Sequence, residues 1–368
     1  MLSYLLVMPP TRIEVSAAAG AYPVIIGAGT LSTLTQEINV LGLGARRIIV
    51  SSPLVWRLHG KRLRGVGSER TAVLVDDGER SKNQQTVARV HDALIRANAD
   101  RSTVIIAVGG GVIGDLVGFA AATYLRGIRV VHVPTTLLAQ VDSAIGGKTG
   151  VNHPLGKNLI GAFHPPSLVA ADPDVLGTLP RREFRAGLYE VIKYGVIADP
   201  TLLDRMHASL HAIFEREPDA VTPLVSASCR IKAAIVSADE REGGSRRTLN
   251  FGHTVGHALE AATKYRRFRH GEAVGYGMLA ALSIGVARGL TPKALADEVD
   301  ALITNLGPLP PVTDISSKEV MAAIGRDKKI VAGTLHFIAA TGRGQTTTLT
   351  DVTAKELRAS MKKLGMRA

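Results

Sequence analysis

The chain has 368 residues, enough for two domains that each bury a core. Hydrophobic residues make up 46% and charged residues 21%, as in a soluble globular protein. The net charge is +12, but no basic run is interleaved with aromatic residues, so we expect no nucleic acid partner. No apolar run reaches the roughly eighteen residues of a membrane span. We therefore expect no membrane contact. Cys229 is the only cysteine, so no internal disulfide can form, and we expect a cytoplasmic protein.

Short runs rich in β-branched residues alternate with helix-sized segments up to residue 180. The runs predict strands at Arg12–Val15, Tyr22–Ile26, Arg47–Ser51, Thr71–Val75, Thr103–Val108, Val130–Pro134 and Leu168–Ala171. Helices are predicted between several of them, including Gln84–Ala97 and Gly114–Leu125. This alternation predicts an α/β domain over residues 1–180, with a Rossmann-like, mainly parallel sheet. Long segments rich in Ala and Leu then predict an all-α domain over residues 181–368.

A glycine-rich turn follows the predicted strand Thr103–Val108. Residues Gly109–Asp115, GGGVIGD, contain the pattern G-x-G-x-x-G and lead into a helical stretch. A helix N-terminus offers N–H groups and a positive dipole end, so this turn suits a pyrophosphate. The acidic residue that usually binds the ribose about twenty residues later is missing. The sequence therefore indicates a nucleotide, and a purely structural turn is the alternative.

The segment from Asp142 to Asn158 is DSAIGGKTGVNHPLGKN. It combines one carboxylate, two lysines and two asparagines with four glycines. Glycine lets the backbone approach a ligand closely, and lysine supplies a charge for phosphate or carboxylate. We interpret the segment as a cradle for a small, polar, anionic molecule. An ordinary solvated loop is the alternative.

Histidines recur at helical spacing in the second half of the chain. His253, His257 and Glu260 stand at i, i+4 and i+7, which places them on one face of a helix, and Asn250 is the expected N-cap. Zinc can bind one or both imidazoles. The segment is not a zincin motif, because Thr254 stands where that motif has its glutamate. His257 as an ordinary core residue is the alternative.

Two further groups accompany these histidines. His270 follows seventeen residues after His253, beside a glycine. Upstream, Glu190 and Lys193 place a carboxylate and an ammonium on one helical face. Spacing alone leaves two interpretations open, a metal site and a solvated ion pair of Glu190 with Lys193.

In this order, the motifs resemble those of the 3-dehydroquinate synthase family, a branch of the sugar-phosphate cyclases. The matching blocks are DGERSK (Asp77–Lys82), GGGVIGD (Gly109–Asp115), ATYLRG (Ala122–Gly127), VPTTLLAQVDSAIGGKTGVN (Val133–Asn152), GKNLIGAF (Gly156–Phe163), EVIKYG (Glu190–Gly195), LNFGHTVGHALE (Leu249–Glu260), HGEAVGYGM (His270–Met278) and RDKK (Arg326–Lys329). They extend over nearly the whole chain, so the resemblance is far more specific than any single motif. It implies the fold of that family, an NAD-binding α/β domain followed by a helical domain.

The resemblance implies roles residue by residue. It implies that a zinc or cobalt ion is held by Glu190, His253 and His270. It implies NAD contacts from Asp77, Gly78, Glu79, Lys82, Gly111, Val112, Ile113, Gly114, Asp115, Thr135, Thr136, Lys148, Lys157 and Thr178. It implies contacts to an anionic sugar-acid phosphate from Asp142, Lys148, Lys157, Asn158, Lys193, Lys232, Arg246, Asn250, His257 and one of Lys328 and Lys329. Arg126 is similar to the residue that reaches the neighbouring subunit's phosphate in this family, so a homodimer is expected.

The family converts 3-deoxy-arabino-heptulosonate 7-phosphate to 3-dehydroquinate and phosphate, in the shikimate route to aromatic amino acids. The resemblance implies the same lyase reaction here, through transient oxidation by NAD, β-elimination of phosphate, return of the hydride and intramolecular aldol closure. Lys148, Asn158 and a lysine at 328 or 329 would hold the phosphate. His257 and Asn250 would hydrogen-bond the ring hydroxyls.

Other functions remain to be distinguished. They are a cyclase for another heptulose or hexose phosphate, a metal-dependent polyol dehydrogenase, and a non-catalytic module that binds NAD or nucleic acid. A dehydrogenase would not need Lys148, Lys157 and Arg246. The chain departs from the family pattern at Ser51–Ser52, where an acidic or amide residue is frequent, and at Tyr189, where the residue is usually small.

Overall fold

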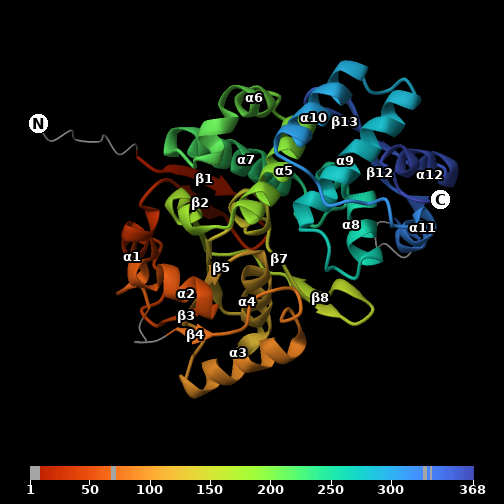
Figure 1. The fold of residues 1–368 in the computed structure, drawn as a ribbon. Helices are drawn as coiled ribbons and strands as arrows, with labels where there is room; N and C mark the ends of the chain where they lie inside the picture. The colour runs from red at the N-terminus through yellow and green to blue at the C-terminus, as the bar shows by residue number, and fades with distance from the viewer. Residues whose placement is uncertain (1–8, 68–71, 326–329, 332–333) are drawn as a thin grey trace, which may run out of the picture. The chain divides into compact units, whose positions relative to one another are not determined.

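The computed structural model describes residues 9–67, 72–325, 330–331 and 334–368, and they fall into two units (Figure 1). The first unit contains the residues up to Pro180 together with Phe214–Arg241. The second contains Arg181–Ile213 and Glu242–Ala368. The sequence predicted domains of residues 1–180 and 181–368. In the structure, residues 214–241 belong to the first unit instead of the second.

A seven-stranded sheet forms the centre of the first unit. Its order is β1 (Thr11–Val15), β2 (Tyr22–Ile26), β9 (Leu168–Ala171), β6 (Arg129–Pro134), β5 (Val104–Gly109), β3 (Arg47–Ser51) and β4 (Val73–Leu74). Only the β1–β2 pair is antiparallel among these described strands. The expected α/β class with a mainly parallel sheet is confirmed. The predicted strands match within a few residues, except that Thr71, where one of them was predicted to begin, lies outside the described residues.

Helices cover both faces of this sheet, because its strands are apolar on both sides. On one face, Ile105 and Ala107 of β5 pack with α3 (Gln84–Arg96) and α4 (Gly111–Thr123). On the other face, Ile106 and Val108 pack with α1 (Thr30–Val40) and the short helix η1 (Gly60–Leu63). The unit also contains α2 (Pro53–His59), η2 (Tyr124–Arg126), η3 (Ala139–Ser143) and η4 (Pro173–Thr178). Successive side chains of β5 point to opposite faces of the sheet, so a hydrophobic core lies on each face.

Helix α7 (Pro218–Ala238) belongs to the first unit although it follows residue 180. It packs on β1, β2, η3 and η4, because its apolar face needs cover and the sheet provides it. Among the described helices it alone is long and apolar enough to cross a membrane. Half of that stretch is buried inside the structure, and Lys232 on it pairs with Asp142. We therefore interpret α7 as a core helix.

Most of the segment Asp142–Asn158 belongs to a β-hairpin rather than to a loop. It consists of β7 (Lys148–His153) and β8 (Gly156–Phe163), which pair antiparallel. A Cβ at Gly150 would lie 2.7 Å from the carbonyl oxygen of Ile160, and one at Gly147 would lie 2.8 Å from Pro165 N. Close contact between backbones therefore accounts for these two glycines without a ligand.

The second unit is helical. Its helices are α5 (Arg181–Ile197), α6 (Thr201–Phe214, with its last residue in the first unit), η5 (Ser245–Asn250), α8 (His253–Ala262), α9 (His270–Ala287), α10 (Lys293–Asn305), α11 (Ser317–Ile324) and α12 (Ala354–Lys363). It also contains two hairpins, β10 (Ile330–Val331) with β11 (Thr334–Leu335) and β12 (Phe337–Gly342) with β13 (Gln345–Leu349). The helical region is confirmed, with hairpins that the sequence did not predict.

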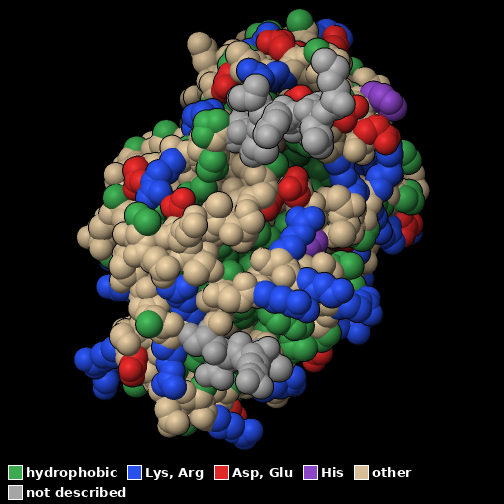
Figure 2. Space-filling model, turned by 90° about the vertical axis from the view of Figure 1, so that its left-hand side faces the viewer, with side chains coloured by type: hydrophobic (Ala, Val, Ile, Leu, Met, Phe, Trp, Pro, Cys, Tyr) green, Lys and Arg blue, Asp and Glu red, His purple; other side chains and the backbone are tan. Residues whose placement is uncertain are grey.

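The positive charge is not gathered in one place on the surface that Figure 2 shows. Lys and Arg side chains form several separate groups there, and Asp and Glu side chains lie among them (Figure 2). A continuous basic stripe is the usual footprint of a protein that binds nucleic acid, and this face does not carry one.

Candidate functional site

Glu190 and Lys193 are buried on α5. Their side chains are 0% and 1% exposed, and Lys193 Nζ forms an ion pair with Glu190 Oε2. Lys193 Nζ also lies 4.8 Å from the centroid of the Tyr194 ring. The alternative of a solvated ion pair is therefore wrong. Burying a carboxylate is unfavourable by several kcal/mol unless cations and hydrogen bonds compensate for it, so this position calls for positive charge.

Two histidines face Glu190, and a third lies beside them. His253 begins α8 and His270 begins α9, and Nε2 of each lies 3.6 Å from Glu190 Oε1. His257, one turn after His253, has its ring centroid 5.1 Å from that of His253 and 5.7 Å from that of His270. We call Glu190, His253, His257 and His270 the histidine centre. The structure thus brings together the three residues that the sequence predicted as metal ligands.

The histidine centre fits a divalent metal ion. One carboxylate oxygen and two imidazole nitrogens are donors that zinc takes in catalytic sites. Zinc bonds of about 2.1 Å in tetrahedral geometry place neighbouring donor atoms about 3.4 Å apart, close to the 3.6 Å between Glu190 Oε1 and each Nε2. The imidazoles of His253, His257 and His270 form a second possible set, with one nitrogen each within 4.8 Å of one another. We favour Glu190 over His257, because a fully buried carboxylate gains more from a cation than a half-buried imidazole does.

Glycines let the helices that carry these residues approach closely. A Cβ at Gly271, next to His270, would lie 1.9 Å from the carbonyl oxygen of Ala186 on α5. A Cβ at Gly277 on α9 would lie 1.7 Å from the carbonyl oxygen of Gly252, which precedes His253. Only glycine allows backbones to meet in this way. Backbone contact therefore sets the distances within the histidine centre.

A buried carboxylate on α9 joins the beginnings of α5 and α9. Glu272 is 0% exposed and accepts hydrogen bonds from Arg182 Nε and Nη2 at 2.7 Å each, and from Arg185 Nη2 at 3.2 Å. It also accepts the backbone N–H of Arg269 at 2.8 Å. Burial raises the pKa of Glu272, but these bonds outweigh it and the pKa is lowered. Glu272 was not predicted as a site residue, since its only signal in the sequence is its place two residues after His270.

The imidazole of His270 carries a second carboxylate partner. Its Nδ1 lies 3.1 Å from Oε2 of Glu260, a residue 3% exposed on α8. Burial lowers the pKa of His270, whereas Glu260 and Glu190 raise it, and the net result is a pKa of about 10. The histidine centre therefore attracts positive charge, as a site for a cation must.

The residues just before α8 differ from expectation. Asn250 is not the N-cap of the helix: Gly252 is, with φ 78°, and no described side chain caps that end. The left-handed conformation of Gly252 separates η5 from α8, so Asn250 ends η5 instead. Its Nδ2 donates to Glu242 Oε1 at 2.7 Å. Arg246 on the same short helix is buried.

Lys82 is the centre of a polar cluster in the first unit. Its Nζ forms an ion pair with Asp115 on α4 and donates to Asn158 Oδ1 on β8 at 2.6 Å. Burial raises the pKa of Asp115, although the Lys82 ammonium opposes this. Asp115 also experiences the charges of Glu79 and Asp142, so these groups lie near it.

Further ion pairs extend this cluster. Lys232 Nζ on α7 lies 2.6 Å from Asp142 Oδ1, and Lys157 Nζ lies 3.5 Å from Glu79 Oε2. Asn152 Nδ2 donates to Glu79 Oε1 at 2.7 Å. The structure thus brings seven predicted residues together, and we call them the lysine cluster: Glu79, Lys82, Asp115, Asp142, Lys157, Asn158 and Lys232.

The glycine-rich turn opens α4 at Gly111. No described side chain caps this end of the helix. A Cβ at Gly110 would lie 2.9 Å from Thr136 Cγ2, and one at Gly111 would lie 2.9 Å from Ser143 Oγ. The N–H of Thr135 donates to the carbonyl oxygen of Gly109 at 2.9 Å. The helix end can therefore receive an anion, and the predicted NAD residues that lie here are Gly111, Val112, Ile113, Gly114, Thr135 and Thr136.

Other predicted residues have contacts of their own. Asp77 is exposed, and its Oδ1 accepts the N–H of Gly78 at 2.6 Å. Thr178 Oγ1 lies 3.0 Å from His59 Nε2. Lys148 is exposed at the first residue of β7. The predicted substrate contact at Lys328 or Lys329 lies outside the described residues.

The positions at which the chain departs from the family pattern are buried. Ser51 Oγ donates to the carbonyl oxygen of Val108 at 2.8 Å, and Ser52 caps α2 through Val55 N. Tyr189 is 0% exposed, and burial raises its pKa to about 12. A Cβ at Gly275 would lie 3.0 Å from the Tyr189 ring. These side chains are therefore used in packing the fold.

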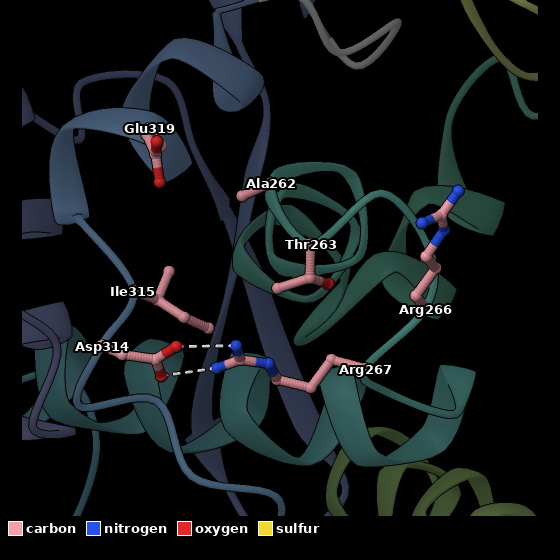
Figure 3. A pocket seen from close by; sticks show the side chains of 7 residues that line it. All are labelled: Ala262, Thr263, Arg266, Arg267, Asp314, Ile315 and Glu319. Atoms are coloured by element: carbon pink, nitrogen blue, oxygen red, sulfur yellow. Dashed lines mark hydrogen bonds and ion pairs between the residues drawn. The ribbon is translucent and has the colours of Figure 1, made fainter.

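A cavity of about 380 Å³ at the end of α8 contains none of the predicted site residues. Arg267 and Asp314 line it and form a bidentate ion pair, with contacts of 2.6 and 2.7 Å (Figure 3). Thr263, Ile315 and Glu319 also line it. The charges of Arg267 and Asp314 therefore neutralise each other.

Comparison with known proteins assigns the chain to a family. A family model described as 3-dehydroquinate synthase N-terminal matches residues 72–186, and one described as 3-dehydroquinate synthase C-terminal matches residues 187–330. The chain is 47% identical over 352 residues to a 3-dehydroquinate synthase of Gloeobacter violaceus, covering 94% of this chain and 97% of the relative. It is 46% identical over 355 residues to one of Nostoc punctiforme, with coverage of 94% and 97%.

A solved structure shows the same fold. It is ValA, a 2-epi-5-epi-valiolone synthase from Streptomyces hygroscopicus subsp. jinggangensis with NAD+ and Zn2+ bound. The TM-score is 0.85 at 31% sequence identity, over 93% of this chain and 96% of that one. With both family models matched in order and relatives aligned over nearly their full length, the chain belongs to the 3-dehydroquinate synthase family.

Proposed function

We propose that the protein is an NAD- and divalent-metal-dependent lyase that converts 3-deoxy-arabino-heptulosonate 7-phosphate to 3-dehydroquinate and phosphate. The observation that carries this proposal is the convergence of Glu190, His253 and His270 in a chain of this family. A family member that had lost the activity would have no reason to keep a fully buried glutamate facing two imidazoles. The metal is zinc or cobalt, held by these three residues.

When bound, the metal would lower the pKa of substrate hydroxyls and NAD would take up and return a hydride. The residues around them supply orientation. Lys193 holds Glu190 Oε2, which leaves Oε1 directed at the two imidazoles. His257 is half-buried beside them and is our candidate for moving a proton at a ring hydroxyl. Arg246 and Asn250 would contact the substrate from η5.

The first unit would bind the anionic groups. The open end of α4 would receive the pyrophosphate of NAD, with Thr135 and Thr136 beside it. The lysine cluster would contact both anionic ligands: Asp142, Lys157, Asn158 and Lys232 would contact the sugar-acid phosphate, together with Lys148, and Glu79, Lys82 and Asp115 would contact NAD. Its carboxylates neutralise the lysines before the ligand arrives, as the pairs of Lys82 with Asp115 and of Lys232 with Asp142 illustrate. By holding the substrate in one orientation, these contacts would favour the intramolecular ring closure. Such orientation can lower the activation barrier by roughly 7–11 kcal/mol.

One incubation tests the proposal. The purified chain, a zinc salt and a catalytic amount of NAD are mixed with the heptulosonate phosphate, and phosphate and reduced cofactor are followed together. We expect phosphate well in excess of NAD with no net reduced cofactor, and 3-dehydroquinate as the product on chromatography. Reduced cofactor formed in step with substrate consumption, without phosphate, would instead establish a polyol dehydrogenase.

A cyclase for another sugar phosphate is the second candidate, because ValA shares the fold at 31% identity. The higher identity of 47% to a 3-dehydroquinate synthase favours our proposal. The same incubation with other heptulose and hexose phosphates separates the two. Faster phosphate release from one of these than from the heptulosonate phosphate would favour the second candidate.

We further propose a homodimer formed by the first unit. Leu159 and Phe163 are exposed on β8, which pairs with β7 alone among the described strands. Arg126, with φ 67°, follows the exposed Leu125 in a turn whose Gly127 lies next to His164. Exposed apolar groups on an edge strand suit a second copy of the chain. Light scattering should give twice the chain mass, and Leu159→Lys with Phe163→Asp should give a monomer; a monomeric wild-type chain would refute the dimer.

We also place the protein in the cytoplasm. Cys229 is fully buried, and its Sγ donates to the carbonyl oxygen of Gln140 at 3.2 Å. Burial raises the pKa of this thiol to about 12, so it stays protonated and unreactive. Fractionation of cells that express the protein would check this location.

A further inference from the structure

Glu260 stands behind the histidine centre rather than in it. It lies two turns after His253 on α8 and reaches the first residue of α9, where its Oε2 is 3.1 Å from Nδ1 of His270. Nδ1 and Nε2 are on different edges of the imidazole ring, and Nε2 of His270 faces Glu190. A metal bound at that Nε2 is therefore out of reach of Glu260. Helical spacing groups Glu260 with His253 and His257, but its carboxylate serves a different purpose.

The imidazoles of His253 and His270 both face Glu190 with Nε2, and each is held by a hydrogen bond at Nδ1. His253 Nδ1 lies 3.0 Å from the carbonyl oxygen of Phe251, and His270 Nδ1 lies 3.1 Å from the carboxylate of Glu260. A carbonyl or carboxylate oxygen can only accept, so each Nδ1 carries a proton. Nε2 is then the ring nitrogen on the side of Glu190, where it can bind a metal ion once any proton on it has been displaced.

The hydrogen-bond partners of the two Nδ1 atoms differ in charge, and this difference affects how strongly each imidazole can bind a metal ion. A carbonyl orients His253 without a full charge, whereas Glu260 offers His270 an anionic acceptor in a buried position. Carboxylate partners of metal-binding histidines fix the ring and raise its basicity, and their loss typically weakens metal binding 10- to 100-fold. His270 should therefore be the more strongly donating imidazole of the pair.

We propose that Glu260 is a positioning residue of the metal centre, which holds the His270 ring by Nδ1 and strengthens its Nε2 as a ligand. This inference rests on the proposed metal site of Glu190, His253 and His270. Glu260 touches neither substrate nor cofactor in this account. We expect it to act through its hydrogen bond to His270, so its removal should weaken metal binding.

The test measures zinc affinity of the metal-free full-length chain by competition with a chromophoric chelator. We compare the wild type with Glu260→Ala and Glu260→Gln. Glu319→Gln on α11 is the matched control, because it removes one exposed carboxylate in the same unit and contacts neither histidine. Unfolding midpoints of the metal-free proteins report any general loss of stability.

We expect one zinc per wild-type chain and unchanged affinity in Glu319→Gln. Glu260→Ala should bind zinc roughly 10- to 100-fold more weakly. Glu260→Gln should fall between the two, because its amide oxygen still accepts the Nδ1 proton but carries no charge. The visible absorption bands of the cobalt-loaded protein should shift in both Glu260 variants, which a purely structural role would not cause.

Folded Glu260 variants with wild-type zinc affinity and unchanged cobalt bands would overturn the inference and leave the metal site standing. A lower unfolding midpoint without a change in affinity would overturn it too, since Glu260 would then only tie α8 to α9. If Glu260→Ala does not fold, the nearly isosteric Glu260→Gln decides alone. Absence of zinc binding by the wild type would refute the proposed metal centre itself, and the inference with it.

Discussion

The histidine centre and the lysine cluster are assembled in opposite ways. In the second unit, backbone contacts at Gly271 and Gly277 bring α5, α8 and α9 close together, and two of the three proposed ligands, His253 and His270, begin α8 and α9. In the first unit, the lysine cluster joins a turn, a hairpin and α7 through ion pairs such as those of Lys82 and Lys232. One site depends on how closely backbones pack, and the other depends on charge compensation.

This difference separates the kinds of substitution to which each site is sensitive. A methyl group at a helix contact should damage the histidine centre although it alters no charge. Removal of one ammonium should damage the lysine cluster although it alters little volume. Rigid elements hold ligand geometry more closely than turns do, which suits a metal in one unit and a flexible phosphate ester in the other.

The largest expected effect comes from His253→Ala. The variant should lose zinc and at least about a thousandfold in turnover, because several kcal/mol of charge stabilisation disappear with the metal. His257→Ala is the matched variant: it should keep the zinc, since our ligand set uses Glu190 instead. Zinc content and turnover of the folded proteins are measured after chelation and reloading. Unaltered turnover in chelator-treated His253→Ala would contradict the account.

Next is Gly277→Ala, which tests whether backbone contact builds the histidine centre. The new Cβ would lie 1.7 Å from the carbonyl oxygen of Gly252, so α8 and α9 must separate. We expect a loss of about 3 kcal/mol in the free energy of unfolding and weaker zinc binding. Gly325→Ala is the control, because its Cβ would make ordinary contacts of 3.7 Å. Equal urea midpoints for both variants would show that the helix contact is not tight.

One histidine in each unit has a shifted pKa, and the two shifts are in opposite directions. Burial, with a smaller effect of His164, lowers the pKa of His132 in the first unit to about 4, whereas that of His270 in the second is raised to about 10. The unfolded chain binds a proton at His132 near pH 6.5, before the folded chain does. Stability should therefore fall by about 3 kcal/mol as the pH drops from 6.5 to 4. Denaturant unfolding at pH 7 and 4.5 should show a smaller loss in His132→Gln, and equal losses would refute this origin.

The smallest effect is expected from Lys82→Met in the lysine cluster. It leaves the carboxylate of Asp115, 20% exposed, without its ammonium partner. We expect a loss of about 2 kcal/mol in the free energy of unfolding, less than for a fully buried pair because solvent screens part of the charge. Lys157→Met is the control, because its pair with Glu79 is longer and more exposed, and less than about 1 kcal/mol is expected. Similar losses for both variants would argue against a central role of Lys82.

Much of the fold was predictable because local patterns and burial agree in the first unit. The runs that predicted β3, β5 and β6 are continuous and β-branched, and both faces of those strands are covered. The hairpin of β7 and β8 was not predicted. Its glycines were read as ligand contacts, whereas Gly147 and Gly150 allow close approach of neighbouring backbone. Sequence alone does not show which atoms a glycine approaches.

The ligand set that we propose for the histidine centre came from the resemblance, not from spacing. Spacing grouped His253, His257 and Glu260, but the structure turns Glu260 toward the back of His270 and brings Glu190 from another helix. Residues that meet only through tertiary packing leave no periodic signal. Glu272 was missed for the same reason, since its partners Arg182 and Arg185 lie on α5.

The most direct test is a crystal structure of the zinc-loaded chain with an anomalous difference map at the zinc edge. The account predicts one strong peak within about 2.3 Å of a Glu190 oxygen and of Nε2 of His253 and His270, with Glu260 on the far side of the His270 ring. A peak coordinated by His257 in place of Glu190, or no peak at the starts of α8 and α9, would contradict it.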